Sequence, residues 1–344
     1  FGSSGLSHVS TFRSFLSVIR LMWSVAFVGL FPVAVFLWRS MRRRLRQSLN
    51  GAAMVVTGCD SGLGLAIVQR LSQEKALVFA TCLTAPGIQA CKKLGANVIP
   101  VQVNITSDTD VDKLQGVVTS ELSQRGATLL GLVNNAGIGS YGFAEALDLQ
   151  QFRNLMEVNC LGTVRVTKAF LPLLRAHGPG ARLVTIGSLS DRLPAGFGSA
   201  YVPTKAYVCW FTESVGFEMK RFGVRASVIE PGFIATELLD GGHKAGSQFS
   251  ENAGDDVRDA YGDFAPMMMR IRKSVMTFEQ MNGGKTGGGP WVADSTVDAL
   301  SSAWPRSRYL VGYDAVIGQL LSSIPGWQRL LGSFFEMEHR AVHP

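Results

Sequence analysis

The sequence has few cysteines, and their spacing argues against the usual cysteine-based sites. Its five cysteines are an odd number and include no pair with C-x-x-C spacing. The five histidines are scattered, and none lies near an acid-rich motif with the spacing of metal ligands. We therefore expect no disulfide framework and no metal, and we take reduced, mostly buried thiols as the default.

Acidic residues are absent from the first 50 positions, which contain seven arginines. Subtracting these seven from the 33 lysines and arginines leaves 26 basic residues against 26 aspartates and glutamates in the rest of the chain. The formal charge of +7 therefore comes from the N-terminal segment alone. The body of the protein is formally neutral, so we predict no nucleic-acid partner.

Charge is also absent from residues 21–38, an apolar run that extends upstream past Arg20. The run is about as long as a helix that spans the bilayer core. Trp23 and Trp38 lie near its ends, where interfacial aromatic residues are common, and an arginine cluster follows at 39–46.

This pattern predicts a polar N-terminus at 1–14 and a single-pass transmembrane helix with its basic cluster at 15–46. Five of the seven arginines follow the apolar run, which favours a cytosolic position for the body of the protein. A buried core helix and a mitochondrial presequence are the alternatives.

Beyond the predicted anchor, short apolar runs alternate with segments of helical periodicity. This alternation predicts one α/β domain at 50–320, a Rossmann-type doubly wound parallel sheet. The expected strands cover 52–57, 77–82, 98–103, 129–133, 182–186 and 224–229.

The first expected strand runs into a glycine-rich turn and then into a helical segment. Gly58, Gly62 and Gly64 have G-x-x-x-G-x-G spacing, which differs from G-x-G-x-x-G. Glycines in this context let the backbone approach a pyrophosphate at the N-terminus of the helix. A strand–helix turn without a ligand is the alternative interpretation.

The end of the second expected strand, Cys82-Leu-Thr84, has neither an acid nor an arginine. An arginine there would accommodate the phosphate of NADP, so its absence favours NAD, with NADP less favoured. The fourth expected strand ends in Asn134-Asn-Ala-Gly137, which predicts a tight turn at the edge where ligands bind.

Tyr201 and Lys205 are spaced so that they share one face of a helix that starts near Pro203. A nearby ammonium stabilises a phenolate, so we expect Lys205 to lower the pKa of Tyr201 towards neutrality. A surface pair is the alternative. Asn159 lies within a long helical pattern at 152–174 and needs a polar partner, either a neighbouring helix or a functional group.

Six motifs occur in order: TGCDSGLG, NNAG, the helical Asn159, Ser188, YVPTK and EPGFIAT. Together they resemble the short-chain dehydrogenase/reductase family over roughly residues 50–320. The segments LVFATCLTAPG, GTVRVTKAFLPLLR, DAYGDF and RSRYLVGYDA resemble its branch of membrane-bound retinol dehydrogenases, 17β-hydroxysteroid dehydrogenases and mitochondrial 3-hydroxybutyrate dehydrogenase.

The resemblance implies four catalytic residues. Tyr201 would be the acid/base, and Lys205 would lower its pKa and contact the nicotinamide ribose. Ser188 would hydrogen-bond the substrate oxygen, with Ser190 as a substitute, and Asn159 would hold a water that links Lys205 to solvent. The implied cofactor-binding positions, besides Tyr201 and Lys205, are Thr57, Gly58, Asp60, Ser61, Gly62, Leu63, Gly64, Asn104, Asn134, Ala136, Gly137, Pro231, Gly232 and Thr236.

Asn104 departs from the family pattern, which usually has an acid that meets adenine at this position. Its amide oxygen can still accept a hydrogen bond, so we expect weaker cofactor binding at this position, not its loss.

Two segments outside these motifs need interpretation. Gly284-Lys-Thr286 lacks the upstream glycine and strand of a phosphate-binding loop, so we predict a flexible surface loop at 283–289. The methionines at 267–269 fall in an expected substrate lid at 237–290 and either line the pocket or pack on the core. The amphipathic tail at 316–344 either lies on the membrane surface or packs on the domain.

The leading hypothesis is an NAD-dependent dehydrogenase anchored in the endoplasmic reticulum membrane, with a lipophilic hydroxysteroid or retinol as substrate. One alternative is a mitochondrial 3-hydroxybutyrate dehydrogenase in the inner membrane, which would need a cation such as Arg258, Arg270 or Arg272 for the carboxylate. A membrane-tethered NAD-binding protein without catalysis is the other. By analogy with the family, helices 108–125 and 152–174 would pair subunits in a homodimer.

Overall fold

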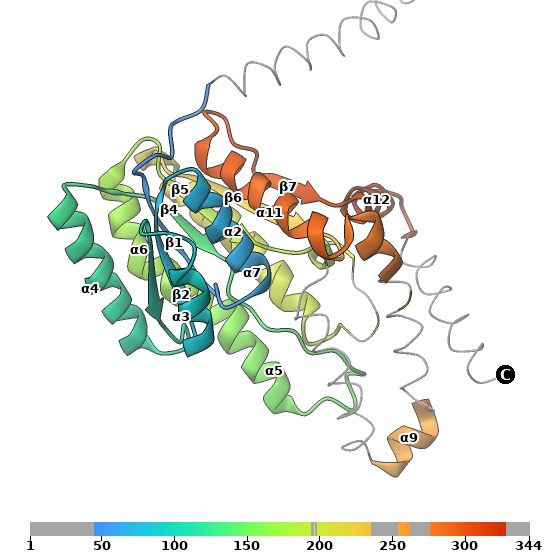
Figure 1. Ribbon diagram of the computed structural model, residues 1–344. Coiled ribbons are helices and arrows are strands. Elements are labelled where there is room, and N and C mark those ends of the chain that lie inside the picture. The colour runs from blue at the N-terminus through green and yellow to red at the C-terminus, as the bar shows by residue number, and fades with distance from the viewer. Residues whose placement is uncertain are drawn as a thin grey trace, which may run out of the picture. The chain divides into compact units, whose positions relative to one another are not determined.

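The structure is a computed structural model that describes residues 45–193, 196, 198–234, 254–261, 273 and 276–327 (Figure 1). Among these residues, no helix combines the length and the apolar character needed to cross a membrane. The predicted anchor at 15–46, apart from its last residues, lies outside the described residues. Thr236, the methionines at 267–269, most of the predicted lid and the end of the predicted tail lie outside them as well.

Seven parallel strands form one sheet in the order β3-β2-β1-β4-β5-β6-β7. Six of them lie where strands were predicted, so the predicted parallel α/β sheet is confirmed. The seventh, at the edge beside β6, was not predicted. The strands are β1 Ala53–Val56, β2 Leu77–Cys82, β3 Val98–Gln102, β4 Leu129–Asn134, β5 Arg182–Ile186, β6 Arg225–Pro231 and β7 Arg308–Val311.

Helices cover both faces of the sheet (Figure 1). Short 3-10 turns, η2 Leu189–Asp191 and η3 Lys220–Phe222, follow β5 and α7. The described α-helices are α2 Gly62–Gln73, α3 Ala85–Lys92, α4 Asp108–Arg125, α5 Leu149–Leu155, α6 Thr163–His177, α7 Val202–Met219, α9 Asp255–Tyr261, α11 Gly284–Ser301 and α12 Tyr313–Ser322.

Strand β1 shows why the sheet is covered on two sides. Its side chains alternate between the faces of the sheet, and all of them are buried. Met54 and Val56 belong to a core cluster with α2 and α11, whereas Ala53 and Val55 belong to a second cluster with α4, α6 and α7. A strand buried on both faces has no polar positions, which explains its continuous apolar run.

The long helix predicted at 152–174 is present but is not one regular α-helix. Between α5 and α6 the chain forms a π-helix, Met156–Gly162, and Asn159 lies within it. A π-helix inserts an extra residue per turn and changes the direction in which side chains point. The hydrophobic periodicity alone could not reveal this irregularity.

The glycine-rich stretch 283–289 is helical from Gly284 onward, so the predicted surface loop is wrong. A β-carbon at Gly288 would lie 2.7 Å from side-chain atoms of Ile234, and one at Gly289 would lie 3.7 Å from the β-carbon of Ala66 in α2. Glycine therefore lets α11 approach its neighbours closely, and this packing outweighs the low helix propensity of glycine.

The order of the strands reverses between β1 and β4. From β1 the chain adds β2 and β3 towards one edge of the sheet, and from β4 it adds β5, β6 and β7 towards the other edge. In open α/β sheets, ligands bind beyond the carboxyl ends of the strands at such a point. The candidate site lies there.

Residues 45–47 and 302–304 belong to a second, smaller compact unit, in which Arg46 forms an isolated antiparallel bridge with Ser302.

Candidate active site

A cavity of about 560 Å³ lies at the carboxyl ends of β1, β2, β4, β5 and β6. Its wall includes most of the positions that the sequence predicted, from the glycine-rich turn to the tyrosine and lysine of α7. The predicted residues in the wall are Gly58, Asp60, Ser61, Gly62, Leu63, Gly64, Asn104, Ala136, Gly137, Ser188, Tyr201, Lys205, Pro231 and Gly232.

The glycine-rich turn between β1 and α2 forms one end of this cavity. Gly58 and Gly62 have φ angles of +68° and +55°, which favour glycine. A β-carbon at Gly64 would lie 2.0 Å from the carbonyl oxygen of Gly58, so any side chain there would force the turn apart. The glycines let the backbone of the turn pack closely at the N-terminus of α2, and such a cradle fits a pyrophosphate.

Asp60 ties the glycine-rich turn to the end of β2. One carboxylate oxygen accepts a 2.9 Å hydrogen bond from Leu83 N, and the other accepts bonds of 2.8 Å and 2.7 Å from Thr84 N and Thr84 Oγ1. The negative charge therefore lies at the end of β2, where the adenosine ribose of a dinucleotide binds in this fold.

The segment after β2 itself contains no acid, because the carboxylate at this place comes from the loop after β1. A carboxylate at this place repels the additional phosphate of NADP and can accept hydrogen bonds from ribose hydroxyls. The signal was present in the sequence as the aspartate of TGCDSGLG, but only the folded chain places it beside Thr84.

Thr57 and Asn134 were predicted to bind the cofactor, but neither lines the cavity. The hydroxyl oxygen of Thr57 accepts hydrogen bonds of 3.0 Å each from Asn135 N and Ala136 N, behind the turn. Asn134 Nδ2 donates to Thr167 Oγ1 at 2.8 Å inside the core. Both residues therefore hold the two loops in place, and the neighbouring Asn135 reaches the cavity wall.

Asn104 lines the cavity, but its amide oxygen is already used. This oxygen accepts hydrogen bonds from Thr106 N at 3.0 Å and from Thr106 Oγ1 at 2.9 Å. The backbone N–H of Asn104 donates to Asp110 Oδ2 at 3.0 Å. These bonds form an Asx turn, which fixes the loop after β3. The predicted hydrogen bond to adenine would compete with this turn.

The residues predicted to be catalytic come together at the other end of the cavity. Ser188 follows β5 and is close enough to the Tyr201 side chain to lower its pKa; its hydroxyl donates to Ser190 Oγ at 3.1 Å, and its oxygen accepts a 3.1 Å bond from Ser190 N. Lys205 Nζ lies 5.8 Å from the centre of the Tyr201 ring and donates to Ile186 O at 3.2 Å. The contact to Tyr201 comes from Ser188, which favours Ser188 over Ser190 as the predicted serine.

Asn159 lies behind this group, outside the cavity wall. Its amide nitrogen donates to Ile138 O and to Thr204 Oγ1, both at 3.0 Å, and its amide oxygen accepts from Ile138 N at 2.8 Å. The π-helix thus directs a buried amide at two neighbouring segments, the loop after β4 and the start of α7.

The surroundings shift the pKa values of the tyrosine and the lysine in opposite directions. Burial, followed by the neighbouring Tyr141, raises the pKa of Tyr201 well above its usual value, and the hydrogen bond from Ser188 only partly opposes this shift. Burial lowers the pKa of Lys205. The expected lowering of the Tyr201 pKa by Lys205 is not found in the protein alone, where the tyrosine is a neutral phenol at neutral pH.

The cavity wall also contains apolar residues. Tyr141 has its ring centre 5.4 Å from that of Tyr201, and the other apolar residues include Ile138, Leu189, Phe233 and Ile234 from three loops. None of these was predicted as a site residue, because apolar residues in loops have no motif of their own. Among the described wall residues, the charged ones are Asp60 and Lys205.

The fold and this group of residues define a class of protein, and a family comparison agrees. The family model described as "short chain dehydrogenase" matches residues 52–245. The chain belongs to the short-chain dehydrogenase family and is an oxidoreductase that acts on CH–OH groups.

The chain is also similar to three dehydrogenases with named substrates. The chain is 37% identical to "D-beta-hydroxybutyrate dehydrogenase, mitochondrial" of Bos taurus, over 76% of this chain and 77% of the relative. It is 31% identical to "3beta-hydroxysteroid dehydrogenase dhs-16" of Caenorhabditis elegans, over 84% and 76% of the two chains. It is also 31% identical to "Retinol dehydrogenase 16" of Mus musculus, over 88% and 93%.

Proposed function

We propose that this protein interconverts a lipophilic secondary or allylic alcohol, a hydroxysteroid or a retinol, with its carbonyl form by using NAD(H). The observation that carries this proposal is the apolar part of the cavity wall, to which Ile138, Tyr141, Leu189, Phe233 and Ile234 belong. A steroid or retinoid skeleton gains free energy by leaving water for such a wall, whereas a small polar acid does not.

The proposed roles follow from the contacts in the cavity. Ser188 donates a hydrogen bond to the substrate oxygen and orients it towards the phenol of Tyr201. Tyr201 gives the carbonyl oxygen its proton in reduction and takes the proton from the hydroxyl in oxidation. NAD, when bound, supplies the hydride acceptor, and the glycine-rich turn, Asp60 and Asn135 hold it.

Lys205 and Asn159 support Tyr201 in this proposal. Lys205 provides a cation beside the buried phenol, and its charge favours the phenolate in oxidation. Asn159 fixes the loop at Ile138 against the helix that carries Tyr201 and Lys205, and it is the candidate holder of a water that would link Lys205 to solvent. In the neutral form found here, Tyr201 is ready to donate a proton, which is the role it has in reduction.

The second candidate function is the oxidation of 3-hydroxybutyrate. Its support is the identity of 37% to the Bos taurus enzyme of that name. A small carboxylate substrate needs a cation in the wall that is separate from Lys205. The described part of the wall shows no such group, and the candidates Arg270 and Arg272 lie outside the described residues. The apolar part of the wall is the reason for preferring the lipophilic substrate.

The membrane assignment rests on the sequence alone. The charge-free run at 21–38 and the arginine cluster at 39–46 support a single-pass anchor in the endoplasmic reticulum membrane with a cytosolic catalytic domain. The mitochondrial inner membrane is the alternative. A lid at 237–290, a membrane-facing tail at 316–344 and a homodimer belong to the same proposal.

The test is NADH formation, followed at 340 nm, by the full chain in detergent. All-trans-retinol, a 3-hydroxysteroid, a 17-hydroxysteroid and 3-hydroxybutyrate would be compared, each with NAD and with NADP. We expect turnover of a steroid or a retinoid with NAD. Turnover of 3-hydroxybutyrate alone would overturn the lipophilic assignment and establish the second candidate. NADH binding without turnover of any substrate would contradict both assignments and favour the tethered NAD-binding protein.

A further inference from the structure

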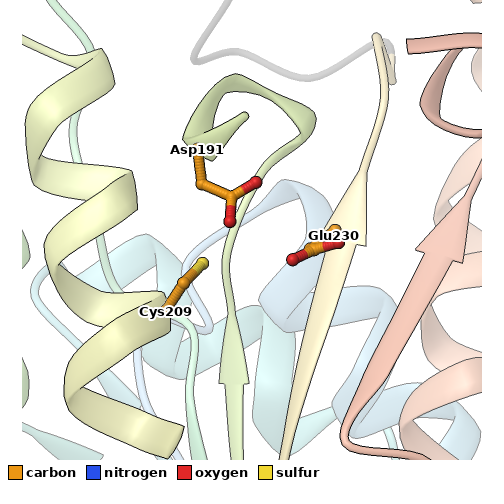
Figure 2. Close-up of side chains that lie close together, drawn as sticks. All are labelled: Asp191, Cys209 and Glu230. Atoms are coloured by element: carbon orange, nitrogen blue, oxygen red, sulfur yellow. The ribbon is translucent and has the colours of Figure 1, made fainter. Parts of the chain in front are cut away.

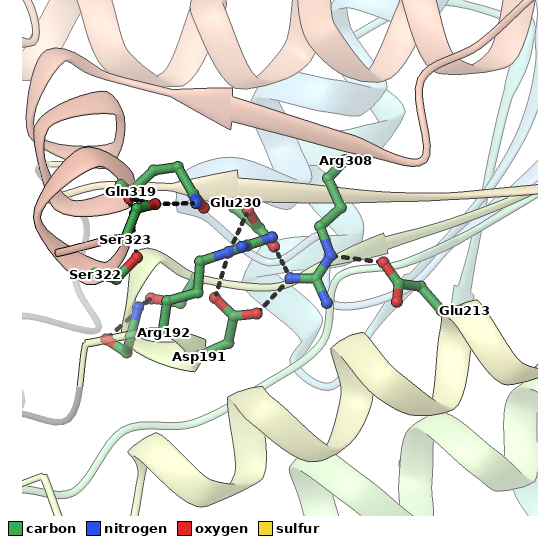
Figure 3. Close-up of polar contacts among 10 residues, drawn as sticks. Asp191, Arg192, Glu213, Glu230, Arg308, Gln319, Ser322 and Ser323 are labelled. Atoms are coloured by element: carbon green, nitrogen blue, oxygen red, sulfur yellow. Dashed lines mark hydrogen bonds and ion pairs between the residues drawn. The ribbon is translucent and has the colours of Figure 1, made fainter. Parts of the chain in front are cut away.

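A buried group of charged side chains lies outside the cavity wall (Figure 3). Its centre is Arg308, the first residue of β7, whose side chain is 14% exposed. Two carboxylates beside it, Asp191 and Glu230, have side chains only 2% and 0% exposed. Burying two carboxylates costs several kcal/mol each unless cations pair with them, so this arrangement needs a reason.

The three carboxylates that Arg308 contacts come from three different elements. Arg308 Nη1 donates to Asp191 Oδ2 at 2.5 Å and also to Glu230 Oε1, while Arg308 Nε donates to Glu213 Oε1 at 2.6 Å. Arg192 adds a second guanidinium, with its Nε 3.5 Å from Glu230 Oε2 and 3.7 Å from Asp191 Oδ1. Figure 3 shows Arg308 between these acids.

Each of these elements also carries part of the candidate active site. Asp191 ends the η2 turn that begins directly after Ser188. Glu230 lies immediately before Pro231 and Gly232 in the cavity wall. Glu213 is on α7, the helix that contains Lys205 and begins after Tyr201. One planar guanidinium therefore joins the serine turn, the loop after β6 and the tyrosine helix, which only an arginine can do with several directed bonds.

A metal site is the competing interpretation of the same place. Asp191, Cys209 and Glu230 offer ligand atoms that all lie within 4.8 Å of one another (Figure 2). However, both carboxylates are paired with guanidinium groups. Burial, and then the two acids, raise the pKa of the Cys209 thiol, whereas a metal needs the thiolate. The chemistry of the donors therefore favours an ion-pair network.

We propose that Arg308 is a positioning residue for the dehydrogenase reaction: it fixes Ser188 relative to Tyr201 by binding Asp191, Glu230 and Glu213 at once. The proposal rests on the proposed function for its kinetic consequences but not for its structural ones. A shift of the serine by about 1 Å is enough to lower a catalytic rate by about 100-fold.

The experiment compares Arg308→Met and Arg308→Lys with the wild-type full chain in detergent. For Arg308→Met, we expect kcat to fall by about 10- to 100-fold and the affinity for NADH to fall less than kcat, because the glycine-rich cradle for the pyrophosphate follows β1, on the other side of the sheet's switch point. Arg308→Lys should recover only part of the rate, because an ammonium cannot keep the directed bonds to all three acids. An unchanged kcat in Arg308→Met would overturn the proposal.

A second variant distinguishes two roles of Arg308: positioning Ser188, and only neutralising the buried carboxylates. Arg308→Met combined with Glu230→Gln removes the unpaired buried charge but does not restore the bridge. We expect this double variant to regain thermal stability and to remain slow. Recovery of both stability and kcat would overturn the proposal and leave Arg308 with a purely structural role. Arg70→Met is the matched control, because Arg70 also binds two acids, Glu74 and Asp294, but lies outside the cavity wall.

Hydrogen exchange gives a readout that does not depend on the substrate. In the NADH-bound protein, we expect the backbone of 187–193 to exchange faster in Arg308→Met than in wild type and in Arg70→Met. If the wild type oxidises none of the alcohols, the proposed function fails, and this measurement still decides the inference. Equal exchange of 187–193 in all three proteins would overturn it.

Discussion

The two ends of the cavity are built in different ways. The dinucleotide end is made of backbone and of short polar side chains: Gly58 and Gly64 let backbone segments pack closely, and Asp60 fixes the edge. The tyrosine end is made of large side chains that come from several loops. Backbone geometry depends on local sequence and can be read as a motif, whereas a wall of side chains depends on how distant loops meet.

This contrast predicts that the two ends can be damaged separately. The largest effect is expected at the tyrosine end: Tyr201→Phe should lower kcat by about 1,000-fold, because the group that exchanges the proton is lost. The affinity for NADH, measured by fluorescence, should stay within about twofold of wild type. Substantial turnover by this variant would contradict the role given to Tyr201.

At the dinucleotide end, Gly64→Ala should have the opposite signature. Its β-carbon would lie 2.0 Å from Gly58 O, so the turn must open and the affinity for NADH should fall by about tenfold or more. Gly116→Ala is the matched control, because a β-carbon there meets nothing within 4 Å on an exposed part of α4. The control should bind NADH normally and melt slightly higher. Equal affinities in the two variants would show that the turn does not hold the cofactor.

Asp60→Asn should change which cofactor is used. Removing the charge at the end of β2 should raise the ratio of kcat/KM for NADP to that for NAD by about tenfold, since the repulsion of the additional phosphate is lost. The binding of 2′,5′-ADP relative to 5′-AMP gives the same comparison without turnover. An unchanged ratio in both measurements would mean that the cofactor choice comes from elsewhere.

The smallest effect is expected far from both ends, at the C-terminus of α6. Burial, and then Arg182, lower the pKa of His177, whose Nδ1 lies 2.8 Å from Thr128 Oγ1. The folded state therefore favours the neutral ring. The contribution of His177 to the free energy of unfolding is fully present above about pH 6.5, and it is lost as the pH falls from there through the lower pKa of the folded state. The free energy of unfolding of the wild type, measured in urea, should fall more between pH 7.5 and pH 5 than that of His177→Gln, by less than about 1 kcal/mol.

The sequence predicted the sheet and most of the cavity wall because these depend on short-range patterns. The strand β1 is one apolar run, and the tyrosine and lysine are one helical turn apart. The strand β7 was missed because its four residues begin with an arginine that becomes buried only by pairing with three distant acids. Likewise, nothing local distinguishes Asn134, which turns into the core, from Asn135, which reaches the wall.

The glycine-rich helix α11 and the pKa of Tyr201 show the same limit. The sequence around Gly288 predicts a loop, and only the folded chain shows that this glycine packs against Ile234 within a helix. The spacing of Tyr201 and Lys205 predicted a lowered phenol pKa, but burial has the larger effect in the protein alone. Close packing and desolvation are properties of the folded chain, and neither is encoded in the spacing of a motif.

Asp60 has a consequence for how this enzyme can change over time. The carboxylate that we expect to disfavour NADP is also the acceptor for three hydrogen bonds that attach the glycine-rich turn to the end of β2. A substitution that relaxes the choice of cofactor therefore also loosens the loop that binds it. Descendants of this chain would need a second, compensating change at Thr84 or its neighbours before NADP could be used well, which makes the preference for NAD hard to lose in single steps.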